Sequence, residues 1–228
     1  MDERLVSMLA ELGLSLTDHQ MKQFESYYKL LIEWNKKLNL TSITQREEVY
    51  LKHFFDSLSL IRATTMSDQT LLDVGSGAGF PSIPLKIVFP DLDVTIVDAI
   101  QKRIGFLSEL VSELDIRVNL IHGRVEELQH REHYDIVTAR AVANLRILSE
   151  LCIPFVKVGG HFLAMKGPNY EEELDESRQA FDILEAELEE IVTYPIEHLE
   201  RSIIKIRKVR PTPSKYPRRF KKIKSKPL

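Results

Sequence analysis

Apolar positions in the first 65 residues recur every three to four positions, the period of helices that bury one face. The second predicted helix begins with a capping box between Thr17 and Gln20, and a third runs from Arg46 to about Arg62. Within the third, His53 to Ser57 places polar groups among aromatic residues, which packing alone explains less easily. We expect residues 1–65 to form a helical extension packed on the rest of the protein.

From Thr70 onward, β-branched runs alternate with helical stretches, a pattern typical of a parallel sheet with helices on both faces. The last two strands have only Pro195–Arg201 between them, too few residues for a helix, so they should pair as an antiparallel hairpin. Strands are predicted at 70–74, 94–98, 117–121, 134–139, 161–165, 191–195 and 202–208. Helices are predicted near 80–89, 101–114, 143–156 and 170–190, with Gly159-Gly160 separating the third of these from the next strand.

The stretch Leu71–Ser82, LLDVGSGAGFPS, joins a predicted strand to a predicted helix through three glycines at alternate positions. Such a unit turns backbone N–H groups toward a small ligand, which glycine allows to approach closely. A dinucleotide fingerprint needs a small residue where the chain has Phe80, and the P-loop pattern is absent. The remaining spacing, Asp-x-Gly-x-Gly-x-Gly over residues 73–79, resembles motif I of the class I S-adenosylmethionine (SAM) methyltransferases. A plain glycine-rich turn is the alternative.

A second acidic residue supports a nucleoside ligand. The alternating strand at 94–97 ends in Asp98, nineteen positions after Gly79, close to the spacing at which an acidic residue holds ribose hydroxyls. A helix N-cap is the other role open to Asp98, and the two roles are compatible.

Composition places the chain among ordinary soluble proteins. With 228 residues, of which 43% are hydrophobic and 29% charged, it is large enough for one domain with a full core. There is no apolar run of about 18 residues, and the acidic start MDER does not fit a signal peptide. Cys152, the single cysteine, rules out an intrachain disulfide and is expected in the core. We therefore expect a cytoplasmic monomer with no membrane contact.

Charge is distributed unevenly along the chain. Residues 201–228 contain twelve Lys and Arg and no Asp or Glu, whereas residues 1–200 contain 19 basic and 34 acidic residues. A basic segment on an acidic body is typical of a polyanion-binding protein, although a solvated, partly disordered tail explains the charge equally well. We expect residues 211–228 to form a basic tail, separate from a cofactor pocket that is formed by strand ends before residue 170.

Three predicted strand ends carry a cation, namely Arg124, Arg140 and Lys166. Ligands of open α/β sheets bind at this edge, so the three cations suggest an anionic substrate such as a phosphate. The histidines are scattered and no G-x-S-x-G elbow is present, which argues against a metal site and a hydrolase nucleophile. Catalysis should therefore depend on positioning a reactive cofactor.

Several motifs, in order and spacing, resemble the RsmG (GidB) family, which uses SAM to methylate N7 of a guanine in a loop of bacterial small-subunit (16S) rRNA. They are YLKHFFDSL at 50–58, LLDVGSGAGFPSIPLKI at 71–87, VDAIQKRIGFL at 97–107, GRVEEL at 123–128, TARAVANL at 138–145, LAMKG at 163–167 and KYPR at 215–218. The resemblance implies a class I methyltransferase domain at 66–210 with a Rossmann-like, seven-stranded sheet, and small-subunit rRNA or the ribosomal subunit as partner.

The glycine motif and the resemblance together assign roles to residues. Cofactor binding is expected of Asp73, Gly75, Gly77, Gly79, Phe80, Asp98, Val125, Glu126 and Arg140. A catalytic role is expected of Arg140, Lys166 and Arg201, and RNA binding of Arg124, Lys166, Arg201, Lys215 and Arg218. The chain departs from the family after KYPR, where Arg219-Phe-Lys-Lys-Ile-Lys replaces a Gly/Pro-rich run common in low-GC Gram-positive members.

The chemistry of N7 fits a site without an evident base. N7 carries a lone pair and no proton, so the enzyme has only to align it with the methyl group. In an RNA duplex N7 lies in a deep, narrow groove, so the target should be unpaired. Two alternatives remain open: a nucleotide-dependent oxidoreductase, which would bind NAD instead of SAM, and a non-catalytic RNA-binding protein, which would transfer no methyl group.

Overall fold

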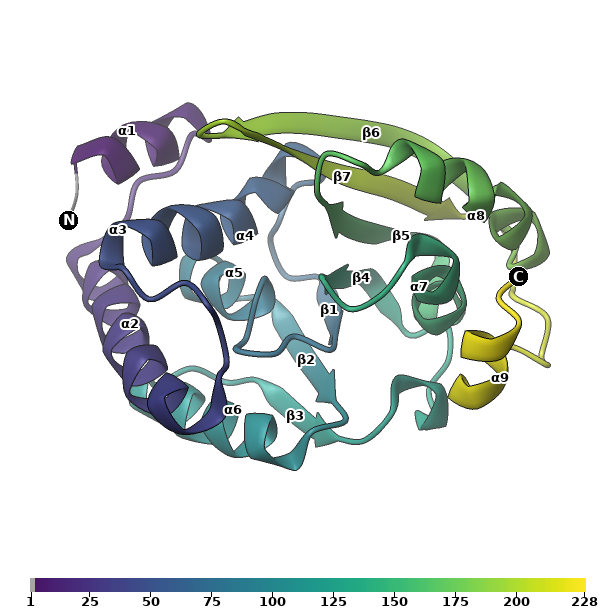
Figure 1. Ribbon diagram of the computed structural model, residues 1–228, viewed down its shortest axis with the longest axis horizontal. Helices are drawn as coiled ribbons and strands as arrows, with labels where there is room; N and C mark the ends of the chain where they lie inside the picture. Colours follow the sequence, from purple (N-terminus) through teal and green to yellow (C-terminus); the bar gives the residue numbers. More distant parts are fainter. Residues whose placement is uncertain (1–2) are drawn as a thin grey trace.

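The chain folds around one seven-stranded sheet, seen in Figure 1. The computed structural model describes residues 3–228, with side chains from Val6 onward; Met1 and Asp2, the start of the predicted extension, lie outside the described residues. The strands are β1 (Thr70–Val74), β2 (Asp93–Asp98), β3 (Asn119–His122), β4 (Tyr134–Arg140), β5 (Val156–Lys166), β6 (Ala186–Ile196) and β7 (Leu199–Lys208).

The α-helices of the described residues are α1 (Glu3–Glu11), α2 (Asp18–Leu38), α3 (Arg46–Val49), α4 (Asp56–Leu58), α5 (Ser82–Val88), α6 (Gln101–Glu113), α7 (Leu145–Cys152), α8 (Glu171–Ile183) and α9 (Phe220–Ser225). A π-helical turn, η1 (Tyr50–Phe55), and three 3₁₀ turns, η2 (Ser59–Arg62), η3 (Val125–Glu127) and η4 (Ile153–Phe155), complete the helical segments. The predicted capping box of α2 is present. Where one helix was predicted from Arg46 to about Arg62, four helical segments follow one another without a break: α3, η1, α4 and η2.

The strand order is β3-β2-β1-β4-β5-β7-β6. Strands β1 to β5 run parallel to one another, and β7 runs antiparallel to β5 and β6, which confirms the predicted fold class and hairpin. The order reverses between β1 and β4, whose carboxyl ends therefore flank the crevice where ligands of such sheets bind.

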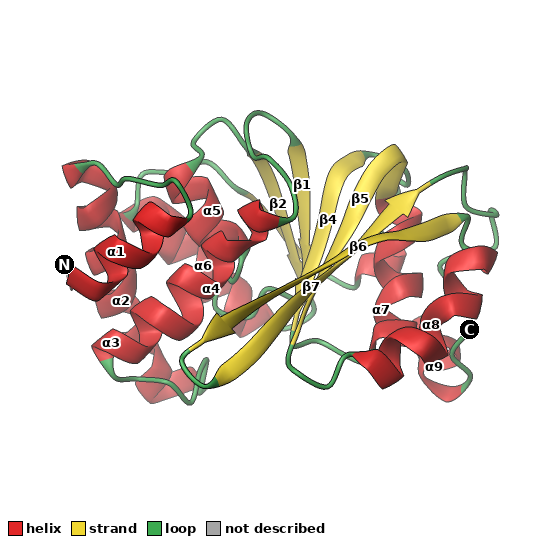
Figure 2. Ribbon diagram, turned by 90° about the horizontal axis from the view of Figure 1, so that it is seen from above, coloured by secondary structure: helices red, strands yellow, loops and turns green. Residues whose placement is uncertain are grey.

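Helices lie on both sides of the sheet, as Figure 2 shows from above, and a hydrophobic core fills the space on each side. Adjacent residues of one strand contribute to different cores, for example Leu71 to the core under α2, α5 and α6 and Leu72 to the core under α7 and α8. The N-terminal helices belong to the first core, and Cys152 is buried in the second, as expected. The Tyr27 hydroxyl of α2 donates to the carbonyl of Ala78 at 2.5 Å, which ties the N-terminal helices to the glycine turn.

Among the boundaries that differ from the prediction, two have a clear physical reason. Strand β5 includes Gly159-Gly160, which we expected to lie before it; a Cβ at Gly160 would stand 2.6 Å from the Asp135 carbonyl oxygen, so glycine permits a close approach to β4 instead of ending an element. Helix α8 ends at Ile183, not near 190. The acidic residues that follow favour a helix locally, yet Glu189 pairs with Lys205 of β7 at 2.7 Å, and cross-strand pairing decides the conformation.

The C-terminal segment 211–228 packs on the second core, which argues against the alternative of a solvated, partly disordered tail. The side chains of Tyr216 and Ile223 are buried in that core. The Arg218 guanidinium donates to both carboxylate oxygens of the fully buried Glu150, at 2.7 and 2.5 Å. The Arg218 guanidinium is thus engaged in an internal ion pair, and an RNA contact by Arg218 stays a prediction.

Candidate active site

A cavity of about 340 Å³ opens where β1, β2 and β4 end. It is lined by Val74, Gly75, Val97, Asp98, Ala99, Ile100, Arg103, Gly123, Arg124, Val125, Glu126, Ala141, Val142, Leu151 and Phe220. Four predicted cofactor residues lie in this wall, namely Gly75, Asp98, Val125 and Glu126. Arg140, the last residue of β4, precedes Ala141 in the chain but does not line this cavity. The lining combines aliphatic side chains with four charged ones, Asp98, Arg103, Arg124 and Glu126.

The glycine turn leaves room for a ligand at this cavity. Gly75 and Gly77 have φ values of +71° and +63°, which side chains rarely adopt. A Cβ at Gly75 would stand 3.0 Å from Val142, whereas no atom lies within 4 Å of the Cβ position at Gly77. The Cβ position at Gly77 thus lies in open space, and Gly75 is the glycine of this turn that lines the cavity.

Gly79 has a different role from the other two glycines. A Cβ there would stand 2.7 Å from Ile83 and 2.8 Å from the Tyr27 hydroxyl, so the missing side chain makes room for packing between α2 and α5. The structure thus gives Gly79 a packing function, and a contact between Gly79 and the cofactor stays a prediction.

We expect Gly79→Ala to destabilise the protein by about 1–3 kcal/mol more than Gly77→Ala does. Both substitutions place alanine at positive φ, at +96° and +63°, but only the one at Gly79 creates a steric clash. Urea unfolding of the two variants measures the difference, with Gly77→Ala as the matched control. Equal free energies of unfolding would contradict the packing role.

Two buried carboxylates lie beside the turn. Asp98, 3% exposed, accepts from Ile100 N at 2.8 Å and from Gly77 N at 3.3 Å, so it braces both the turn and the entry to α6. Asp73 accepts two hydrogen bonds from Ser82 through Oδ2, while its buried Oδ1 has no partner. Burial raises the pKa of Asp73 to about 7, against the effect of the Ser82 bonds. This unfilled hydrogen-bonding capacity fits a site for a polar ligand.

A second cavity, of about 270 Å³, adjoins the first at Ala141. It is lined by Ile43, Lys52, His53, Asp56, Arg140, Ala141, Met165, Lys166, Gly167 and Arg201. The three predicted catalytic residues, Arg140 from β4, Lys166 from β5 and Arg201 from β7, are thus brought together around one cationic pocket.

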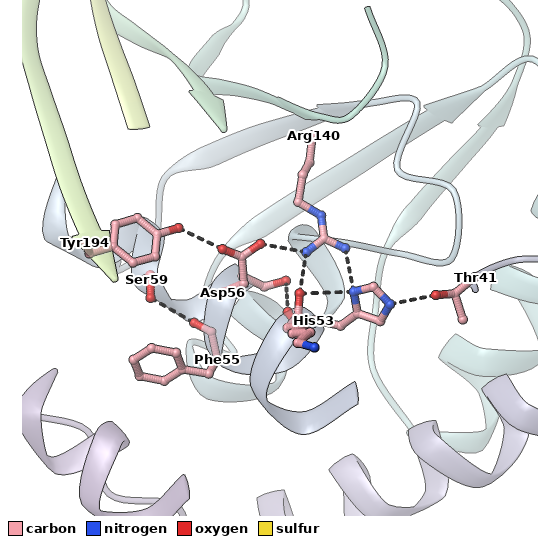
Figure 3. A network of polar contacts seen from close by, with 9 residues as sticks. Thr41, His53, Phe55, Asp56, Ser59, Arg140 and Tyr194 are labelled. Atoms are coloured by element: carbon pink, nitrogen blue, oxygen red, sulfur yellow. Dashed lines mark hydrogen bonds and ion pairs between the residues drawn. The ribbon is translucent and has the colours of Figure 1, made fainter. Parts of the chain in front are cut away.

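A polar network fixes Arg140 in this pocket, as Figure 3 shows. The guanidinium donates from Nη1 to Asp56 Oδ2 at 2.9 Å and from Nη2 to His53 Nδ1 at 3.2 Å. The Tyr194 hydroxyl donates to the other Asp56 oxygen at 2.9 Å. Phe80 lies beneath, with its ring centroid 4.8 Å from the Arg140 guanidinium carbon and 4.6 Å from the His53 ring centroid. Phe80 therefore supports this network and is absent from the lining of the first cavity.

His53 is neutral in this network. Burial lowers its pKa to about 3, and the charges of Arg140 and Arg201 act in the same direction. His53 Nδ1 lies 3.2 Å from Arg140 Nη2 and 3.1 Å from the Lys52 carbonyl oxygen, and Nε2 lies 2.8 Å from the Thr41 hydroxyl. Both ring nitrogens are thus engaged in holding the pocket together.

The neutral His53 predicts a specific pH dependence of stability. An unfolded chain binds a proton at His53 near pH 6.5 and the folded chain only near pH 3, so acidification from 6.5 toward 3 favours unfolding. Relative to wild type, His53→Gln should lose less stability between pH 7 and 5, by up to about 2 kcal/mol. Denaturant unfolding at both pH values measures this, and His198→Gln, at an exposed position, is the control that should follow wild type. A His53→Gln variant with the wild-type pH dependence would contradict a neutral His53.

The remaining predicted site residues differ in their hydrogen-bond partners and in their exposure to solvent. Lys166 Nζ lies 2.6 Å from Glu173 Oε2 and donates to the Ala143 carbonyl, whereas the buried Nε of Arg201 has no partner. Arg124 and Lys215 are exposed. Glu126 accepts from the backbone N–H of Phe220 at 3.2 Å.

Sequence reasoning did not assign His53, Asp56, Tyr194 and Phe220 to the site. The polar groups of 53–57 among aromatics were a usable signal for the first two. Tyr194 and Phe220 gave no such signal, and Phe220 adds a residue from beyond position 170 to the lining of the first cavity. That the cofactor pocket is formed before residue 170 stays a prediction.

Within residues 3–228, no helix combines the length and apolar character needed to cross a bilayer. In the same described part of the chain, no three His, Cys, Asp or Glu side chains gather as a metal site.

Residues 20–204 match the family model described as rRNA small subunit methyltransferase G, GidB. A relative named ribosomal RNA small subunit methyltransferase G from Bacillus cytotoxicus is 53% identical over 225 residues, covering 95% of this chain and 94% of the relative. A relative with the same name from Bacillus cereus is 52% identical with the same coverage.

Solved structures similar to this chain share its fold at low identity. The YcgJ protein from Bacillus subtilis has a TM-score of 0.56 at 16% identity, over 69% of this chain and 100% of that one. The M. jannaschii TYW2 structure in complex with AdoMet has a TM-score of 0.54 at 14% identity, over 62% of this chain and 70% of that one.

Proposed function

Because the chain belongs to the rRNA small subunit methyltransferase G (GidB) family, we propose that it is a SAM-dependent methyltransferase that forms 7-methylguanosine in a loop of bacterial 16S rRNA. The observation that carries the proposal is the pair of cavities that meet at Ala141, one suited to a nucleoside cofactor and the other lined by cations. Their junction gives a place where a methyl donor and a base can meet.

The first cavity fits SAM. Asp98, whose carboxylate lies in the wall at the end of β2, would hold the ribose hydroxyls, and the turn at Gly75 and Gly77 would admit the methionine part. The aliphatic side chains of Val97 and Val125 offer apolar surface to the adenine. SAM, when bound, supplies a methyl group whose carbon–sulfur bond breaks as the N7 lone pair forms the new bond.

The second cavity fits a guanine and its phosphates. Guanine presents O6 and N7 as acceptors on one edge, and N7 has to stay free to react, so the protein donors should bind O6. The partnerless Nε of Arg201 makes this side chain the candidate donor, while Arg140 is held rigidly by Asp56 and His53. Lys166 adds positive charge for the RNA backbone.

No proton has to be removed from N7, and the residues around the described pocket match this requirement. His53 uses both ring nitrogens in hydrogen bonds, and Asp56 is bound by Arg140 and Tyr194. These groups position the base and do not act as general bases. Catalysis then comes from alignment.

We also propose that the protein acts in the cytoplasm as a monomer and contacts RNA through Arg124 and Lys215. Both side chains are exposed. The large hydrophobic side chains exposed among the described residues come from separate segments, and two of them, Ile100 and Val142, line the first cavity. That distribution gives little apolar surface for a permanent partner.

The experiment measures cofactor and product together. Calorimetry with SAM and with NAD should show binding of SAM alone, and nucleoside analysis of small-subunit rRNA after incubation with labelled SAM should recover 7-methylguanosine. Binding of NAD without SAM would favour the oxidoreductase alternative, against which the bulky, buried Phe80 also argues. RNA binding without methyl transfer would favour the RNA-binding alternative.

A further inference from the structure

We infer that Phe220 is a cofactor-binding residue, whose ring stacks on the adenine of SAM, so that the C-terminal segment completes the cofactor site. The inference rests on the proposed function for the identity of the ligand. The family model ends at residue 204, so it assigns no role to this position.

Phe220 is placed where the cavity lacks an aromatic surface. Among the described residues that line the cavity it is the single aromatic side chain; the other apolar residues are aliphatic. Adenine is flat and aromatic, and bases bound by proteins gain affinity from stacking on such rings. The Phe220 ring is half-buried, which leaves part of its surface available to a ligand.

The position of the Phe220 ring is fixed from several sides. Its backbone N–H donates to Glu126 in η3, which lines the same cavity. The Arg124 guanidinium carbon lies 4.9 Å from the ring centroid. Two residues earlier, Arg218 is bound to buried Glu150, and three residues later Ile223 is buried. In Figure 1, α9 accordingly lies beside α7 at the end of the molecule that carries the C-terminus.

These anchors have a consequence for binding. A ring that is already held in place loses little conformational entropy when it stacks on a ligand. Most of the free energy of the stacking contact therefore contributes to affinity. Phe220 and Arg124 form one aromatic–cation stack at the cavity edge, and a purine would extend it.

The test is calorimetric binding of S-adenosylhomocysteine, the demethylated product, to wild type and to a series at position 220. Phe220→Ala should weaken binding roughly five- to a hundredfold. Phe220→Tyr, which keeps the ring, should stay close to wild type, and Phe220→Leu should fall between them. Lys221→Ala, next to Phe220 and exposed, is the matched control and should bind as wild type does.

A second measurement does not depend on the alanine variant folding. A tryptophan at 220 should change its fluorescence when S-adenosylhomocysteine is added, and a tryptophan at 221 should not. Wild-type affinity in Phe220→Ala, or unchanged emission of the Phe220→Trp variant at saturating ligand, would overturn the inference and leave the proposed function intact. Failure of the wild-type protein to bind SAM or its product would instead count against the proposed function.

Discussion

Arg140→Ala is expected to slow methyl transfer at saturating RNA by about two to three orders of magnitude, while the SAM dissociation constant changes by less than about threefold. Arg140 lies at the junction of the two cavities, and its guanidinium is oriented by Asp56 and His53. Without the Arg140 side chain, the second cavity loses the group that shapes it on the side facing the cofactor cavity. The cofactor cavity keeps its lining residues, since Arg140 is absent from them.

Single-turnover kinetics with saturating RNA, together with calorimetry for SAM, separate the two effects. Arg117→Ala, at an exposed arginine near the far edge of the sheet, is the control and should keep wild-type rates. If the Arg140→Ala enzyme turned over at the wild-type rate once RNA is saturating, this result would show that Arg140 contributes to RNA binding and not to the transfer step.

Arg218→Ala should lower the free energy of unfolding by about 3–5 kcal/mol. The substitution leaves the Glu150 carboxylate, which is 0% exposed, without its bidentate partner. It also detaches the segment that carries Phe220 from α7. Arg219→Ala, at the exposed neighbour, should change stability by less than about 0.5 kcal/mol.

Urea unfolding of these variants tests the buried pair. A double variant in which Glu150 and Arg218 are both methionine should recover most of the lost stability, because no buried charge is left unpaired. A loss below about 1 kcal/mol in Arg218→Ala would show that the C-terminal segment contributes little to the fold.

Local patterns in the sequence were sufficient for the architecture. The glycine turn after β1, the acidic end of β2 and the short link before the last strand each depend on neighbouring residues, and the structure contains all three. The boundary between α8 and β6 could not be predicted in the same way. There the intrinsic preference of glutamates for helix is overridden by pairing with β7, a contact made far along the chain.

The site was predictable to the extent that it lies at strand ends. Arg140 and Lys166 follow from the topology, because parallel strands bring their carboxyl ends to one edge. Tyr194 reaches Asp56 across 138 positions of sequence. Phe220 reaches the cavity because the Arg218–Glu150 ion pair and the burial of Ile223 fold the C-terminal segment back. Charge composition alone could not distinguish that folded segment from a solvated one.

The central claim is that the two adjoining cavities transfer a methyl group from SAM to N7 of a guanine in small-subunit rRNA. The most direct measurement incubates the protein and SAM with unmodified small-subunit rRNA and with intact small subunits. Borohydride reduction and aniline then cut the RNA at 7-methylguanosine, and primer extension maps the cut. We expect SAM-dependent cleavage at one unpaired guanine, abolished in the Gly75→Val variant, whose new side chain would press against Val142 at the cofactor turn. Labelled methyl groups on another atom or on a paired guanine, or no transfer to either substrate, would contradict the account.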